Sequence, residues 1–93
     1  MKSYEAMFIL RSDLPEDKFD KTLTQIKDVL SKHKTSVDEM KEWGKQKLAY
    51  PIKKKEEGIY YLVNFHADTD TINKMRKIFN LNDAILRTLI IAV

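Results

Sequence analysis

The sequence contains no cysteine, only two glycines and two prolines, and no long hydrophobic run. Without cysteine the chain can form no disulfide framework, thiolate metal site or thiol nucleophile. The two glycines, Gly44 and Gly58, are too few for the glycine-rich loops that hold nucleotide phosphates. The first apolar run covers only residues 6–10 before charges follow, so we expect neither a signal peptide nor a membrane span. A single domain over residues 1–93 is expected.

Groups that could support catalysis are scarce. His33 and His66 fall in different halves of the chain, and neither is followed four residues later by a histidine or cysteine, so we expect neither a metal site nor an acid partner at either of them. The serines lie in no nucleophile-elbow context, and the acids mostly alternate with lysines, as they do on solvated helices. We therefore expect no enzyme activity, no metal and no cofactor.

The formal net charge of +3 is too small to indicate a nucleic-acid partner, but the positions of the lysines are more informative. Residues 41–55 contain six lysines and a single acid, Glu42. Lysines on an edge strand can prevent aggregation, and they can also bind nucleic-acid phosphates, so both interpretations stay open. Trp43 and Tyr50 lie among the lysines, as base-stacking side chains would, and either could equally fill core space.

Hydrophobic periodicity divides the chain into four strands and two amphipathic helices. Both faces of the first strand are partly apolar, which indicates a central strand. In the second strand, Val37 and Met40 are an odd step apart and need a bulge to share a face. The expected strands are 3–10, 35–52, 59–66 and 84–93, and the expected helices are about 15–33 and 68–79.

This element order, β-α-β-β-α-β, predicts an α+β fold. With right-handed crossovers it gives a ferredoxin-like two-layer sandwich, an antiparallel four-stranded sheet in the order 4-1-3-2 with both helices on one face. The other face is left uncovered and strongly apolar, which is unusual for an isolated monomer. If Arg87 faces outward, that face holds Met7, Ile9, Tyr60, Leu62, Ile85, Leu89 and Ile91.

The RNA-recognition motif has the same topology, but its third strand needs a basic residue, a glycine and outward aromatics. Here Glu57 stands at the basic position, and Ile59 and Asn64 stand at aromatic positions. We therefore expect the apolar face to contact protein rather than stacked bases.

Several segments together resemble a known family. They are Tyr4-Glu5, the run Gly44-Lys45-Gln46-Lys47-Leu48-Ala49-Tyr50-Pro51-Ile52-Lys53, the triplet Gly58-Ile59-Tyr60, and the final arginine-containing apolar strand. Over residues 2–92 the chain is similar to the bacterial small-subunit ribosomal protein six family, although Gln46 stands where that family usually has Arg or Lys. The resemblance implies a non-catalytic cytoplasmic protein of the small (30S) ribosomal subunit. It also implies binding to the central domain of 16S ribosomal RNA together with small-subunit ribosomal protein eighteen, with no membrane and no small-molecule substrate.

We predict two binding surfaces from these observations. The expected RNA-binding residues are Lys2, Tyr4, Lys45, Lys47, Lys53, Lys54 and Arg87, and the expected protein-partner interface is Met7, Ile9, Tyr60, Leu62 and Leu89. Folding could bring Lys2 and Arg87 together at one end of the sheet. Tyr4 could instead belong to the core, and Arg87 could pair with a carboxylate. The alternative function is a ferredoxin-like regulatory or small-molecule-binding domain that homodimerises through its apolar sheet face.

Overall fold

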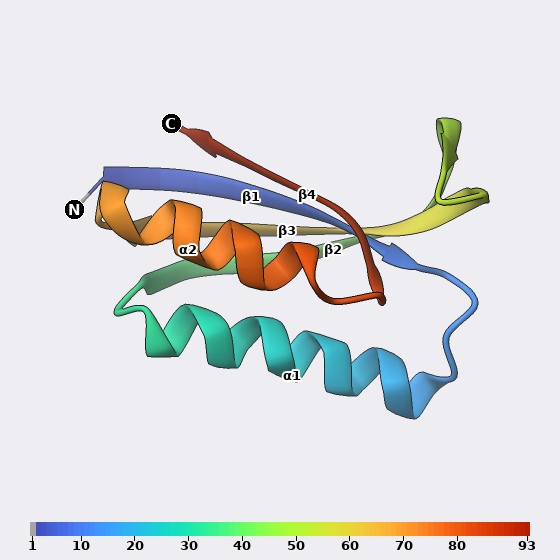
Figure 1. Ribbon diagram of the computed structural model, residues 1–93, viewed down its shortest axis with the longest axis horizontal. Coiled ribbons are helices and arrows are strands. Elements are labelled where there is room, and N and C mark those ends of the chain that lie inside the picture. Colours follow the sequence, from blue (N-terminus) through green and yellow to red (C-terminus); the bar gives the residue numbers. More distant parts are fainter. Residues whose placement is uncertain (1) are drawn as a thin grey trace.

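In the computed structural model, which describes residues 2–93, two helices pack against one face of a four-stranded antiparallel sheet (Figure 1). The strand order β2-β3-β1-β4 is the predicted order 4-1-3-2 in the opposite direction, so the ferredoxin-like fold is confirmed. Neither helix in this part of the chain is long and apolar enough to cross a membrane. The elements are β1 (Lys2–Arg11), α1 (Glu16–Lys32), β2 (Ser36–Ile52), β3 (Lys55–Ala67), α2 (Thr69–Asn80) and β4 (Ile85–Ala92).

The core fills the space between the sheet and the helices. Because strand side chains alternate between faces, every second residue of β1 and β3 points toward the helices, as their pattern predicts. Phe8 packs edge-to-face against Phe79, with ring centroids 4.9 Å apart. The fully or nearly buried residues of this core include Tyr4, Ala6, Phe8, Leu10, Ile26, Leu30, Val63, Phe65, Ile72, Met75 and Phe79.

A bulge in the pairing of β1 with β4 changes which residues face outward. The register pairs Ile9 with Arg87 but Leu10 with Ile85, so Leu86 is an extra residue. Ile85 therefore turns into the core and is 2% exposed, and its predicted outward position is wrong. Beyond the bulge the expected register holds, because Leu89 stands opposite Met7 on the outer face.

The β2–β3 hairpin is longer than the sequence pattern predicts. β3 begins at Lys55 rather than near residue 59, because Lys53 and Lys54 form a two-residue turn in which both have positive φ (49° and 65°). Three register shifts bend β2 against β3, and the first lies at the predicted bulge between Val37 and Met40. At the third, residues 48–51 stand opposite Glu56 alone, so this stretch bulges out of the β2–β3 ladder.

Candidate nucleic-acid and protein-binding surfaces

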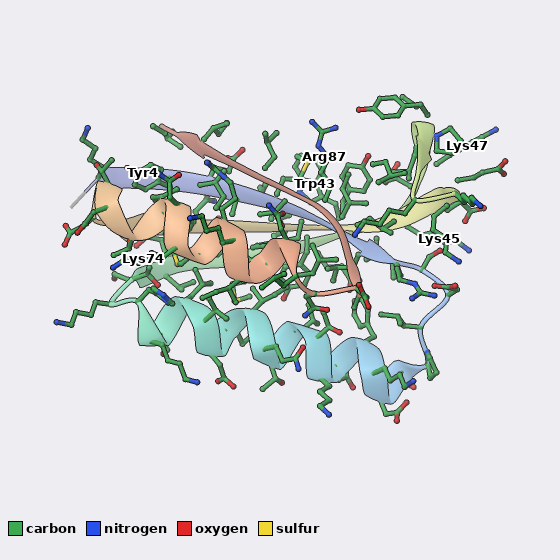
Figure 2. The ribbon with its side chains drawn as sticks, viewed as in Figure 1. Tyr4, Trp43, Lys45, Lys47, Lys74 and Arg87 are labelled. Atoms are coloured by element: carbon green, nitrogen blue, oxygen red, sulfur yellow. The ribbon has the colours of Figure 1, made fainter. Side chains whose placement is uncertain are left out.

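The end of the β2–β3 hairpin, residues 45–57, forms an arm that projects from one end of the molecule (Figure 1). Four of the predicted RNA-binding lysines lie on this arm. Lys45 and Lys47 stand opposite Ile59 and Glu57 in the β2–β3 ladder, and Figure 2 shows both at the end of the molecule far from Tyr4. Lys53 and Lys54 form the turn at the tip. All four lysines are exposed, so the fold gathers them on one solvent-facing element.

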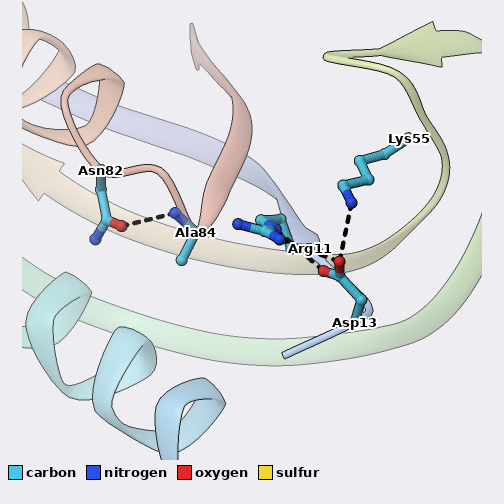
Figure 3. A network of polar contacts seen from close by, with 5 residues as sticks. All are labelled: Arg11, Asp13, Lys55, Asn82 and Ala84. Carbon is cyan, nitrogen blue, oxygen red and sulfur yellow. Dashed lines mark hydrogen bonds and ion pairs between the residues drawn. The ribbon is translucent and has the colours of Figure 1, made fainter. Parts of the chain in front are cut away.

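Acidic residues from neighbouring segments partly neutralise the arm. Lys45 Nζ lies 2.9 Å from a Glu57 carboxylate oxygen, and Lys55 Nζ lies 2.9 Å from Asp13 Oδ2. Arg11 donates to the same Asp13 carboxylate, with Nε 3.0 Å from Oδ1 (Figure 3). These hydrogen bonds from Arg11 and Lys55 hold the pKa of Asp13 well below its usual range. Exposed pairs such as these contribute little stability, but they reduce the local positive charge.

Lys47, Lys53 and Lys54 make no ion pair with any other residue of 2–93. They are therefore the arm's most available cations. The basic run of residues 41–55 looks stronger in the sequence than on the folded surface, because its counter-charges come from β3 and from the loop after β1.

Tyr4 and Lys2 lie away from the arm. Tyr4 is 7% exposed, its ring stacks on Phe65 at a centroid distance of 5.8 Å, and its hydroxyl donates to Thr69 Oγ1 at 3.3 Å. Lys2 pairs with Ala67, whereas Arg87 pairs with Ile9, which lies about 23 Å further along β1. The expectation that Lys2 and Arg87 meet at one end of the sheet is therefore wrong.

Arg87 contacts the arm instead of a carboxylate. Its Nη1 donates to the Tyr50 hydroxyl at 2.7 Å, although β4 and β2 occupy opposite edges of the sheet, about 14 Å apart if it were flat. The bent arm thus reaches across the face that the helices leave uncovered. Leu48, 7% exposed, packs there against Ile9 and Leu86 and anchors the arm. The arm therefore forms a wall at one end of this open face.

Three transverse rows of side chains make up the open face. The middle row consists of Lys41, Leu62, Met7 and Leu89. The row on the side of the arm consists of Gly44, Tyr60, Ile9 and Arg87. The row on the opposite side consists of Glu39, Asn64, Glu5 and Ile91. All five residues predicted for the partner interface are in these rows. A cavity of about 190 Å³ is lined by Met7, Ile9, Tyr60, Arg87 and Leu89. The face is apolar at its centre, and Leu89 and Ile91 are 46% and 48% exposed.

A polar cluster that sequence reasoning missed closes the end of the open face opposite the arm. His66 Nδ1 lies 2.7 Å from Asp38 Oδ2, and its Nε2 lies 2.8 Å from Ser3 Oγ. His66 therefore does have an acidic neighbour, contrary to our expectation, because the pairing of β2 with β3 sets Ser36 opposite His66 and leaves Asp38 two residues further along the same strand. The His66 and Asp38 side chains are 42% and 49% exposed, so water reaches both. We interpret the cluster as a structural contact that links β1, β2 and β3 through side chains. Among residues 2–93 no group of three or more potential ligand side chains could hold a metal ion.

Comparison with known proteins places this geometry in a family. Residues 3–92 match the family model described as Ribosomal protein S6. The chain is 44% identical over 88 residues to the small ribosomal subunit protein bS6 of Corynebacterium kroppenstedtii, covering 95% of this chain and 93% of that protein. The bS6 protein of Caldanaerobacter subterraneus subsp. tengcongensis is 38% identical over 91 residues, with 98% and 96% covered. The crystal structure of 30S ribosomal protein S6 from Thermotoga maritima matches with a TM-score of 0.92 at 26% identity, over 99% of this chain and 87% of that chain.

Proposed function

This chain belongs to the ribosomal protein S6 family, and we propose that it binds the central domain of 16S ribosomal RNA together with small-subunit ribosomal protein eighteen. Family membership makes it a non-catalytic protein of the small ribosomal subunit in the cytoplasm. The observation that carries the finer proposal is the position of a lysine-bearing arm directly beside an uncovered apolar sheet face.

The RNA surface in this proposal is the arm. Lys45, Lys47, Lys53 and Lys54 would neutralise phosphates, and the release of condensed counterions would make the affinity depend on salt. Arg87 lies at the base of the arm and has free donors besides the one that Tyr50 accepts. Lys2 would be a separate contact at the other end of the sheet. We leave out Tyr4, because its buried ring offers little surface to RNA.

The protein surface in this proposal is the open face. Covering Met7, Leu62, Tyr60 and Leu89 removes apolar area from water, which is the main favourable term in protein association. The partner would also touch the wall formed by the arm, since Leu48 and Tyr50 border the same face. Holding the arm in one arrangement before RNA arrives would reduce the ordering cost of RNA binding.

The RNA surface can be tested with the double variant Lys45→Gln/Lys47→Gln. We expect weaker binding to a central-domain rRNA fragment, and a slope of log affinity against log salt that is shallower by about 1.5, because two phosphate contacts are lost. The matched control is Lys21→Gln/Lys27→Gln, which removes two exposed lysines from α1. A slope that stays the same in the arm variant, or that falls equally in the control, would refute the assignment.

The protein surface can be tested with Leu62→Glu. We expect this variant to keep its circular dichroism spectrum and lose binding to protein eighteen, because a charge would be buried in the apolar centre of the interface. Leu81→Glu is the control, since Leu81 is 84% exposed beyond the end of α2 and away from the open face. Unchanged binding of Leu62→Glu would exclude the open face. If the wild-type chain alone sediments as a tight dimer that Leu62→Glu dissociates, the homodimer alternative is favoured.

A further inference from the structure

Charge is distributed unevenly along the open face. The row furthest from the arm carries two acids, Glu39 on β2 and Glu5 on β1, on either side of Asn64. Toward the arm the sign of the charge reverses, because Lys41 is part of the middle row and Arg87 is part of the row nearest the arm. The apolar centre therefore lies between an acidic end and a basic end. A charged molecule that covers it is favoured in one orientation over the opposite one.

The two glutamates at the acidic end form no ion pair within the part of the chain that the structure describes. Within residues 2–93, neither Glu5 nor Glu39 lies within ion-pair distance of a basic side chain, whereas Asp38 is already occupied by His66. Glu5 is also partly buried between β3 and β4. A partner that covered these carboxylates without supplying a cation would leave them desolvated and unpaired, which is strongly unfavourable.

From this pattern we infer that the segment covering the open face places an arginine or lysine over Asn64, between Glu5 and Glu39, next to apolar side chains over Met7 and Leu62. Two strand spacings separate β2 from β1, so a cation centred over β3 lies about 5 Å to the side of each acidic strand. Neighbouring rows are about 7 Å apart along the strands. The partner's apolar side chain over Met7 and Leu62 therefore lies about 7 Å from this cation. The charge gradient thus sets the orientation of the partner segment.

The arm favours a narrow segment over a second copy of this chain. If two copies stacked their open faces in antiparallel orientation, the acidic end of each would lie over the basic end of the other. Each sheet would then collide with the wall that Leu48 and Tyr50 form on the other copy. A single helix or strand can lie on the middle and acidic rows without crossing that wall. This inference rests on the proposed function, because it describes the partner at the same protein surface.

The test measures association with protein eighteen by surface plasmon resonance at low and high salt. The variants are Glu5→Gln/Glu39→Gln and the charge reversal Glu5→Lys. The control is Glu16→Gln/Asp20→Asn, which removes two exposed acids from α1 on the opposite layer. We expect the neutralised pair to bind at least about tenfold more weakly and with less salt dependence, the reversal to bind more weakly still, and the control to match wild type. Melting temperatures identify any variant that fails to fold, and Glu39→Gln alone, on an exposed edge strand, then serves in its place.

Each outcome has a distinct meaning. If Leu62→Glu abolishes binding while all the acidic-row variants bind like wild type, the proposed interface stands and this inference is overturned. If Leu62→Glu also binds normally, the open face is excluded as the surface that binds protein eighteen, and this inference is overturned with it. If the wild-type chain does not bind protein eighteen at all, the proposed function itself fails. A wild-type homodimer that Glu5→Lys dissociates would identify a second copy as the occupant and would equally overturn the inference.

Discussion

Gly58 offers a sharp test of how the arm is anchored to the sheet. It is buried in β3 opposite Arg11, where a Cβ would overlap Ile9 Cγ2 and lie 3.3 Å from the Leu10 carbonyl oxygen. Ile9 has little room to withdraw, because Leu48 and Leu86 pack around it. The substitution Gly58→Ala therefore forces apart the small cluster that holds the arm.

The expected effect is a moderate loss of stability. Extra atoms in a packed core typically cost about 1–3 kcal/mol. Replacing glycine in a strand with alanine recovers about 0.5–1 kcal/mol of backbone entropy. Because Ile9 is confined by Leu48 and Leu86, the cost should lie in the upper part of the first range. The net destabilisation should then be about 1–2 kcal/mol, which lowers Tm by roughly 5–15 °C in a domain of this size. Urea denaturation and scanning calorimetry measure both quantities.

A double-mutant cycle separates this clash from a general effect of losing glycine. Ile9→Ala removes the overlapping methyl, so Gly58→Ala should cost at least about 1 kcal/mol less in that background. Gly44→Ala is the control, because among residues 2–93 no atom outside its two chain neighbours lies within 4 Å of its Cβ position, and the cost comes from its own backbone φ of 87°. The Gly44→Ala cost should not depend on Ile9. If Gly58→Ala is neutral, or if Ile9→Ala does not relieve it, the proposed packing of this cluster is incorrect.

Three further predictions concern single side chains. Thr88 Oγ1 is buried without a hydrogen-bond partner among residues 2–93, so Thr88→Val should raise the free energy of unfolding by about 1 kcal/mol in a thermal melt. The pKa of Asp13 is depressed, so its ion pairs stabilise the fold at neutral pH, and this stabilisation is lost as the pH falls toward that pKa. Because the pairs are exposed, the urea midpoint of Asp13→Asn should be only slightly below that of wild type at pH 7, and the two should converge in strong acid. Tyr50→Phe removes the bond to Arg87 and should reduce the factor by which protein eighteen strengthens RNA binding, measured as the ratio of dissociation constants with and without the partner.

The regular parts of the fold could be predicted because each follows a simple period. Alternation in β1 correctly places Phe8 on the helix side of the sheet and Met7 on the open face. The spacing of Ile72, Met75 and Phe79 correctly predicts the buried side of α2. These patterns are local, since each residue's orientation depends on its own strand or helix. The element order then leaves few topologies, so the sheet order also follows from the sequence.

Bulges were harder to predict, because they depend on which residues of two distant segments face one another. A single extra residue, Leu86, turns Ile85 inward, and nothing in the run of apolar residues in β4 marks the change. In β2 the odd spacing of Val37 and Met40 did indicate a bulge. The larger bulge at residues 48–51 showed no such sign except Pro51, which cannot donate to a ladder hydrogen bond.

The same dependence on pairing explains why the charge of the candidate surfaces could be predicted only in part. A count along residues 41–55 finds the lysines, but it omits Glu57 and Asp13, which approach only after β3 folds back and the loop after β1 passes the arm. The acidic row on the open face is equally hidden, because Glu5 and Glu39 are far apart in sequence and share a row only through their common neighbour Asn64. Surface charge in this small sheet protein is therefore a property of strand register. A one-residue slip of β2 against β3 would move Glu39 to the helix side of the sheet and leave Glu5 alone at the acidic end.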